Sequence, residues 1–139
     1  SYISFKNAEM SEGEFVKEVA EEADCLILLD VNNVYVSAMN HSFDARGYFE
    51  NIPYSRVKEI HLGGHEEYGE FLVDTHSRAV TDAVWDLYGE TIEALGAVPT
   101  LIEWDNDLPA FEVLLAEARR AEEVQNAIFN DSKRAATAF

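Results

Sequence analysis

Three short apolar runs, each followed by polar residues, recur along this chain. The runs lie in residues 25–31 (CLILLDV), 56–62 (RVKEIHL) and 97–104 (AVPTLIEW). The first run is apolar throughout, without alternation, which is typical of a strand buried on both faces, as in a parallel sheet. The pattern therefore predicts three strands, with polar side chains at the point where each one ends.

Helical patterns occupy the first half of the chain between these runs. Ser11 and Glu14 form the signature of a capping box, which predicts a helix to about Ala23 with Phe15, Val19 and Ala20 facing inward. Residues 44–52 predict a short helix capped by Asp44, and residues 63–71 predict a glycine-bearing loop.

The second half repeats the same order of patterns. Apolar residues recur at helical spacing from about Thr81, and Gly96 is placed where a helix would end. Asp107 and Pro109 are start signals for a further long helix, and the tail from Asn130 has weak periodicity that predicts fraying.

Strands that alternate with helices predict the α/β class, with parallel strands joined by right-handed crossovers. The chain has 139 residues and is 47% hydrophobic, which is enough for one core of ordinary size. We expect a single domain over residues 1–129 and a frayed tail over residues 130–139.

The composition excludes several classes of partner. The net charge of −17 makes general binding to a phosphate backbone unfavourable, so we expect no nucleic-acid partner. The sequence shows no apolar run of about 18 residues and no signal-peptide pattern, so we expect a cytoplasmic protein without a membrane contact.

The single cysteine, Cys25, is predicted to be a buried structural thiol.

The chemistry-bearing residues gather after the predicted strands. In parallel α/β folds the loops converge at the carboxyl ends of the strands. Carboxylates, imidazoles and carboxamides without thiolates form a ligand set that suits iron(II), manganese or zinc. The candidates at the strand ends and in the loop after the second strand are Asp30, Asn32, Asn33, His61, His65, Asp74, His76, Glu103 and Asp105.

Each candidate also has a purely structural interpretation. Asp30 is equally suited to capping a loop, and Asn32 or Asn33 to a left-handed turn position. His61 is also explained by a hydrogen bond to a backbone carbonyl, and His65 and His76 by exposure in polar loops. Glu103 is the strongest candidate, because a glutamate directly after an apolar strand needs a partner.

Five segments resemble, in this order, the C-terminal part of the multinuclear non-haem iron-dependent oxidative enzymes. They are LLDVNNVYVSAMNH, RVKEIHLGGH, LVDTH, VWDLY and VPTLIEWDNDLP, and the resemblance runs from about Ser1 to Ala121. It implies a (β/α)8 TIM barrel that holds two or three iron ions and uses O2 to modify residues, often Cys, of ribosomally made peptides. It also implies a peptide substrate and a partner protein that presents the peptide.

The resemblance also implies roles for particular residues. Tyr35 and Trp104 would line the substrate channel, and manganese or zinc would be an alternative to iron in the purified protein. The implied metal ligands are Asp30, Asn33, His61, His65, Asp74, His76 and Glu103.

The chain is short for this fold, because a TIM barrel has eight strands and typically about 250 residues. We therefore expect a fragment covering about the last three βα units, with an incomplete metal site and with exposed sheet edges that favour self-association. Two other functions remain open. One is a divalent-metal sugar isomerase or endonuclease on a similar barrel, and the other is a catalytically inert half-barrel.

Overall fold

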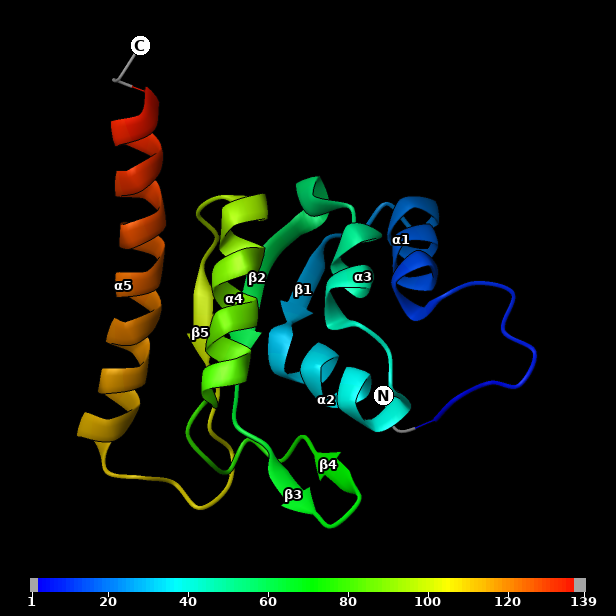
Figure 1. Ribbon diagram of the computed structural model, residues 1–139, viewed down its shortest axis with the longest axis horizontal. Coiled ribbons are helices and arrows are strands. Elements are labelled where there is room, and N and C mark those ends of the chain that lie inside the picture. Colours follow the sequence, from blue (N-terminus) through cyan, green and yellow to red (C-terminus); the bar gives the residue numbers. More distant parts are fainter. Residues whose placement is uncertain (1–2, 137–139) are drawn as a thin grey trace.

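A parallel sheet lies at the centre of the computed structural model, which describes residues 3–136 and the side chains of residues 3–130. The sheet consists of β1 (Ile27–Asp30), β2 (Val57–Leu62) and β5 (Thr100–Ile102), in the order β1-β2-β5 (Figure 1). Both strand pairs are parallel, which confirms the predicted α/β class. The three strands are compatible with part of a (β/α)8 barrel.

Helices and a small hairpin connect these strands. The remaining elements are α1 (Glu12–Glu22), α2 (Val31–His41), α3 (Ala45–Glu50), the 3-10 helix η1 (Tyr54–Arg56), β3 (Glu66–Tyr68), β4 (Phe71–Val73), α4 (Asp82–Leu95) and α5 (Phe111–Ala136). Strands β3 and β4 pair in antiparallel fashion and form a hairpin that projects beyond the sheet (Figure 1). Within residues 3–136, no helix is both long enough and apolar enough to cross a membrane.

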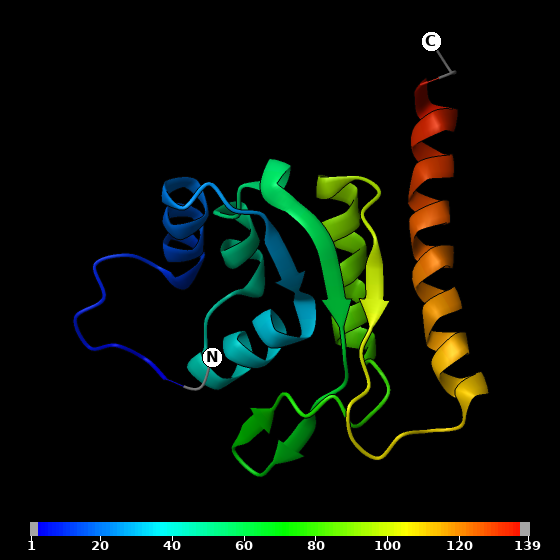
Figure 2. The same ribbon diagram turned by 180° about the vertical axis from the view of Figure 1, so that it is seen from behind.

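The hydrophobic core lies between one face of the sheet and α4. Ile60 and Leu62 of β2 and Tyr88 and Ile92 of α4 are fully buried there. On the other face, Leu28 is 50% exposed and Leu101 is 45% exposed. No described helix lies in front of this second face (Figure 2). The first strand is therefore buried on one face only, which corrects the prediction of two buried faces.

Local signals in the sequence set several helix ends as predicted. The Ser11 hydroxyl accepts from the Glu14 backbone N–H and the Glu14 carboxylate accepts from the Ser11 N–H, which completes the capping box of α1. Asp44 caps α3 through the Arg46 N–H. Gly96 ends α4 with φ of 85°, a conformation that favours glycine.

Helix α2 and the β3–β4 hairpin were missed, as was the short 3-10 helix η1. Helix α2 begins directly after β1, with Asp30 as its N-cap, so residues 31–41 are helical. The predicted glycine loop, residues 63–71, includes β3 and the turn of the β3–β4 hairpin, where Gly69 has φ of 66°, and β4 extends beyond it to Val73. Both follow from local chemistry, since an aspartate is a strong cap and a glycine permits a tight turn.

Other predictions need correction. Cys25 is exposed, because it lies in the turn before β1 begins. Phe15 is 57% exposed and Val19 is 45% exposed, because only one stripe of α1 contacts the core. Helix α5 begins at Phe111 and not at Asp107, whose φ of 48° is not helical.

Helix α5 also includes most of the stretch that was predicted to fray. It runs to Ala136, since alanine, lysine and arginine in this stretch are good helix formers. Residues 137–139 lie outside the described residues.

Candidate metal centre

The carboxyl ends of the three parallel strands meet at one end of the sheet, next to α2 and the hairpin (Figures 1 and 2). Asp30 at the end of β1 is the register partner of His61 in β2. The Glu103 N–H donates to the Leu62 carbonyl at 2.8 Å, which fixes Glu103 beside the end of β2. Because strand residues alternate between faces, Asp30, His61 and Glu103 all lie on the face that α4 does not cover.

His76 reaches this group from the loop after the hairpin. Its N–H donates to the Gly64 carbonyl at 2.9 Å, and its carbonyl accepts from the Asp105 N–H at 2.7 Å. The loop passes so close that a Cβ at Gly63 would lie 2.6 Å from His76 Cδ2. A Cβ at Gly64 would lie 2.1 Å from the Arg78 carbonyl oxygen. The two glycines of HLGGH are therefore required for His76 to lie at the strand ends.

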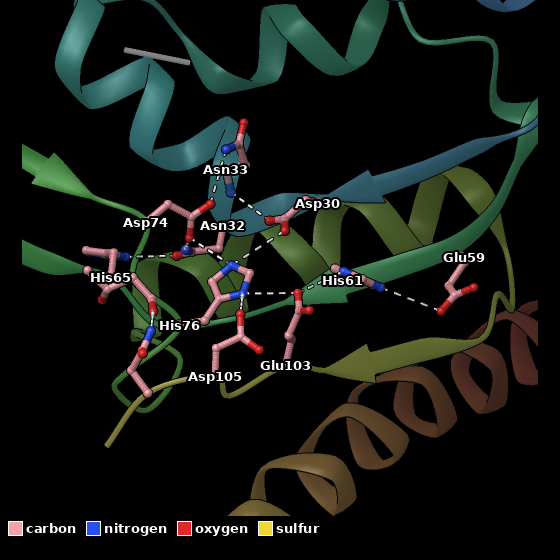
Figure 3. Close-up of polar contacts among 12 residues, drawn as sticks. Asp30, Asn32, Asn33, Glu59, His61, His65, Asp74, His76, Glu103 and Asp105 are labelled. Carbon is pink, nitrogen blue, oxygen red and sulfur yellow. Dashed lines mark hydrogen bonds and ion pairs between the residues drawn. The ribbon is translucent and has the colours of Figure 1, made fainter. Parts of the chain in front are cut away.

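The His76 ring lies among carboxylates from three chain segments (Figure 3). Its Nδ1 lies 3.0 Å from Glu103 Oε2, and its Nε2 lies 2.9 Å from Asp74 Oδ1 and 3.7 Å from Asp30 Oδ2. Asp30, His76 and Glu103 each offer a ligand atom, and these atoms lie within 4.8 Å of one another. We call these three residues the triad.

His61 and Asp105 extend the triad on the side of Glu103. His61 Nδ1 lies 3.1 Å from Glu103 Oε2, and Asp105 Oδ2 lies 3.5 Å from His76 Nδ1. The His61 side chain is 15% exposed, whereas that of Asp105 is 60% exposed. His61 is therefore part of the enclosed group, and Asp105 lies at its solvent edge.

The first turn of α2 holds Asp74 in place. Asp30 accepts from the Asn33 N–H at 2.7 Å, so this member of the triad also caps α2. The side-chain amide of Asn33 donates to Asp74 Oδ2 at 3.1 Å, and that of Asn32 donates to Asp74 Oδ1. The left-handed turn considered for Asn32 and Asn33 is therefore wrong, since both lie in a helix.

A second layer lies behind Asp74. Asn32 is fully buried, and its Oδ1 lies 2.8 Å from Nδ1 of His65, which is 8% exposed. The Tyr35 ring lies 5.3 Å from the His65 ring. His65 is thus turned toward Asn32 and not toward the triad, and the interpretation of His65 as an exposed loop residue is wrong. Asn32, for which the sequence left open either a place in the site or a turn position, connects the two layers.

Burial and charge shift the pKa values in this group. Burial raises the pKa of Asp30 and lowers that of His65. Contact with the Asp74 carboxylate raises the pKa of His76 to about 9, against the effect of burial. Burial acts to raise the pKa of Asp74, but its contacts with His76, Asn33 and Asn32 outweigh burial and lower it. A proton on His76 thus balances part of a concentrated negative charge.

The donor set fits a divalent cation. Two carboxylates and an imidazole from separate segments are ligands that iron(II), manganese and zinc accept. The His76 Nε2 atom is buried and has no hydrogen-bond partner among the residues that the structure describes, although Asp74 lies within ion-pair distance. A cation bound there would satisfy this nitrogen and offset the repulsion between the carboxylates.

The predicted site residues therefore fall into three groups. Asp30, His61, Asp74, His76 and Glu103 come together at the strand ends. Asn33 contacts Asp30 and Asp74 directly, whereas His65 lies behind Asn32, which in turn contacts Asp74. Tyr35 packs against His65, and Trp104 follows Glu103 with an indole Nε1 that is buried without a hydrogen-bond partner among the described residues.

Comparison with known proteins extends these observations. The model of a family described as "RiPP precursor modification enzyme MbnB/TglH/ChrH" matches residues 1–126. A UPF0276 protein from Anaeromyxobacter sp. (strain Fw109-5) is 54% identical over 127 residues, which cover 91% of this chain and 45% of the relative. A UPF0276 protein from Acaryochloris marina (strain MBIC 11017) is 50% identical over 121 residues, covering 87% of this chain and 44% of the relative. The chain spans less than half the length of these relatives.

Proposed function

We propose a function on the basis of a family assignment: this chain belongs to the RiPP precursor modification enzyme MbnB/TglH/ChrH family. RiPPs are ribosomally synthesised and post-translationally modified peptides. In our proposal, the chain supplies part of the metal centre of an iron-dependent oxidative enzyme. The complete enzyme uses O2 to modify residues, often Cys, of a ribosomally made peptide.

One observation carries this proposal. The triad places ligand atoms of Asp30, His76 and Glu103 within 4.8 Å of one another, although these residues lie far apart in the sequence. Carboxylates gathered this closely repel one another unless a proton or a cation lies among them. The family assignment and the donor set both favour a metal ion as that cation.

The side chains have distinct roles in this proposal. Asp30, His76 and Glu103 bind the metal, and His61 and Asp74 lie close enough to complete its coordination or that of a second ion. Asn33 and His65 hold these ligands in place from behind. Iron, when bound, supplies the redox chemistry, and the chain positions the ligands and supplies the negative charge that favours a cation.

The substrate and partners follow from the same proposal. Tyr35 packs against His65, and Trp104 directly follows Glu103 in the chain; in our proposal both contact the peptide. A second protein that presents the peptide is a further proposed partner. In a complete enzyme as long as the relatives, the rest of the protein would add further ligands, so that two or three iron ions are bound in total. Manganese or zinc would be alternatives to iron in the purified protein.

Anaerobic loading with iron(II) followed by metal analysis tests the proposal. We expect the wild-type chain to bind iron, and Glu103→Gln to weaken binding about 100-fold because it removes one charged ligand. Glu112→Gln is the matched control, since Glu112 is exposed at the start of α5. A thiolate charge-transfer band on adding a Cys-containing peptide would support the oxidative enzyme.

The other results would contradict the proposal. Preference for a single manganese or magnesium ion would favour the isomerase or endonuclease alternative. If the wild-type chain bound no metal, or if the wild type and Glu103→Gln bound iron(II) with equal affinity, the triad would not be the metal site.

A further inference from the structure

The side chain of Asn40, at the far end of helix α2, attaches this helix to the β3–β4 hairpin. The Leu72 N–H donates to Asn40 Oδ1 at 2.8 Å, and Asn40 Nδ2 donates to the Leu72 carbonyl at 2.9 Å. The carboxamide of Asn40 thus satisfies both backbone groups of one strand residue. It replaces the donor and acceptor that a neighbouring strand would supply.

The hairpin needs such support. Each of its strands has three residues, and a two-stranded hairpin of this size is at best marginally stable in water. Its rings give little help, because Tyr68 is 52% exposed and Phe71 is 54% exposed. An ion pair at 2.5 Å between Arg78 and Glu66 fixes β3, whereas Asn40 fixes β4.

The attachment matters because β4 leads directly into the candidate metal centre. Asp74 follows β4 and His76 comes two residues later. Helix α2 therefore holds this segment at two points, with Asn40 at Leu72 and with Asn32 and Asn33 at Asp74. Two points of attachment fix both the position and the direction of the chain, whereas one point would leave it free to swing.

We propose that Asn40 is a positioning residue: it holds β4 against α2 and thereby fixes Asp74 and His76 at the strand ends. Asn40 does not itself contact the triad in our proposal. The metal-binding part of this inference rests on the proposed function, whereas the positioning of Asp74 is measurable without metal.

The test compares Asn40→Ala with Asn51→Ala. Asn51 Nδ2 donates to the Gly47 carbonyl at 3.1 Å within α3, so its removal also deletes a side-chain-to-backbone hydrogen bond but far from the hairpin. Asn40→Asp is a third variant, because it keeps the acceptor for the Leu72 N–H and loses the donor.

Three readouts are expected to respond to Asn40→Ala. Amide hydrogen exchange over residues 71–73 should become at least tenfold faster. The side-chain NH2 signals of Asn32 and Asn33, which report on Asp74, should shift or broaden in metal-free protein. The affinity for manganese(II) or anaerobic iron(II) should fall about tenfold, the range for residues that orient ligands. Asn40→Asp should give smaller changes, and Asn51→Ala none of them.

The outcomes separate this inference from the proposed function. Unchanged exchange over residues 71–73, or unchanged Asn32 and Asn33 signals, would overturn the role of Asn40 whether or not metal binds. Faster exchange with unchanged metal affinity in a metal-binding wild type would also overturn it, because Asn40 would then be merely structural. A wild type that binds no metal would refute the proposed function, and the NH2 signals would still decide whether Asn40 positions Asp74.

Discussion

The two faces of the central sheet use neighbouring residues of the same strands for different purposes. In β2, Ile60 is fully buried under α4, whereas the next residue, His61, points to the opposite face and contacts Glu103. In β1, Leu29 is 3% exposed on the covered face, whereas Asp30 belongs to the triad on the other face. Successive side chains of a strand point to opposite faces of the sheet. The side chains on one face therefore stabilise the fold, and those on the other face form the candidate metal centre.

The physical requirements of the two faces are opposite. The covered face gains free energy by removing apolar surface from water, and it contains mainly aliphatic and aromatic side chains. The end of the uncovered face gathers carboxylates that repel one another, and burial raises the pKa of Asp30 there. Substitutions on the two faces should therefore change different measured quantities.

Shortening a side chain on the covered face should have the largest effect. Ile60→Ala removes buried methyl groups and leaves a cavity, so we expect the free energy of unfolding in urea to fall by about 3–4 kcal/mol. Leu28→Ala, on the uncovered face of the neighbouring strand, should lower it by less than about 1 kcal/mol, because Leu28 is already 50% exposed. Equal losses for the two variants would contradict the division of the faces.

The pH dependence of the free energy of unfolding should distinguish the metal centre from the core. We expect this effect to be smaller than that of Ile60→Ala and larger than that of self-association. The pKa of His76 is raised from 6.5 to about 9 in the folded protein. This stabilisation is complete below pH 6.5 and is lost as the pH rises through 9, because the folded state then gives up a proton that it held more tightly than the unfolded state. We expect metal-free protein to lose about 1–2 kcal/mol over this window in urea titrations.

Two variants sharpen this pH prediction. His76→Asn should remove the loss above pH 6.5, whereas Ile60→Ala should lower stability equally at every pH. The lowered pKa of His65 acts only below pH 6.5, so it does not interfere with this window. A wild-type profile that is flat from pH 6.5 to 9 would show that His76 holds no extra proton.

The covered face could largely be predicted from the sequence. The three apolar runs became β1, β2 and β5, and the caps at Ser11, Asp44 and Gly96 set helix ends as expected. These features depend on residues that are close in sequence, so their signals are local. The expectation of two buried faces failed because what covers a strand depends on chain segments elsewhere.

The candidate metal centre could be predicted only as a set of residues. The sequence indicates that Asp30 and Glu103 lie at strand ends and that His76 lies in the loop after the second strand, but it does not give their mutual distances. Asn40 escaped because its partner, Leu72, lies 32 positions away, and the contact of Asn32 with Asp74 escaped because it spans 42 positions. The available signal for these contacts was Asp30 as the cap of a helix that begins directly after it. The residue spacing of this helix brings Asn33 to the strand end and Asn40 to the hairpin.

The smallest expected free-energy change concerns self-association. This experiment tests whether the uncovered face of the sheet brings two copies of the chain together. Strands β1 and β5 are the edges of the described sheet, and Leu28 and Leu101 leave apolar area exposed beside them. We expect weak, concentration-dependent association in sedimentation experiments. It should strengthen with salt, because screening reduces repulsion between chains of net charge −17. Leu28→Lys should weaken association about threefold to tenfold, roughly 1 kcal/mol.

Phe15→Lys is the control for this last experiment, since Phe15 is an equally exposed apolar residue on α1 and the substitution makes the same change in charge. If both variants weakened association equally, the effect would come from charge or general hydrophobicity and not from the sheet. A chain that stayed monomeric at high concentration and high salt would mean that the edges and exposed leucines are not sufficient to bring two copies together. The uncovered face would then differ from the covered one in chemistry alone.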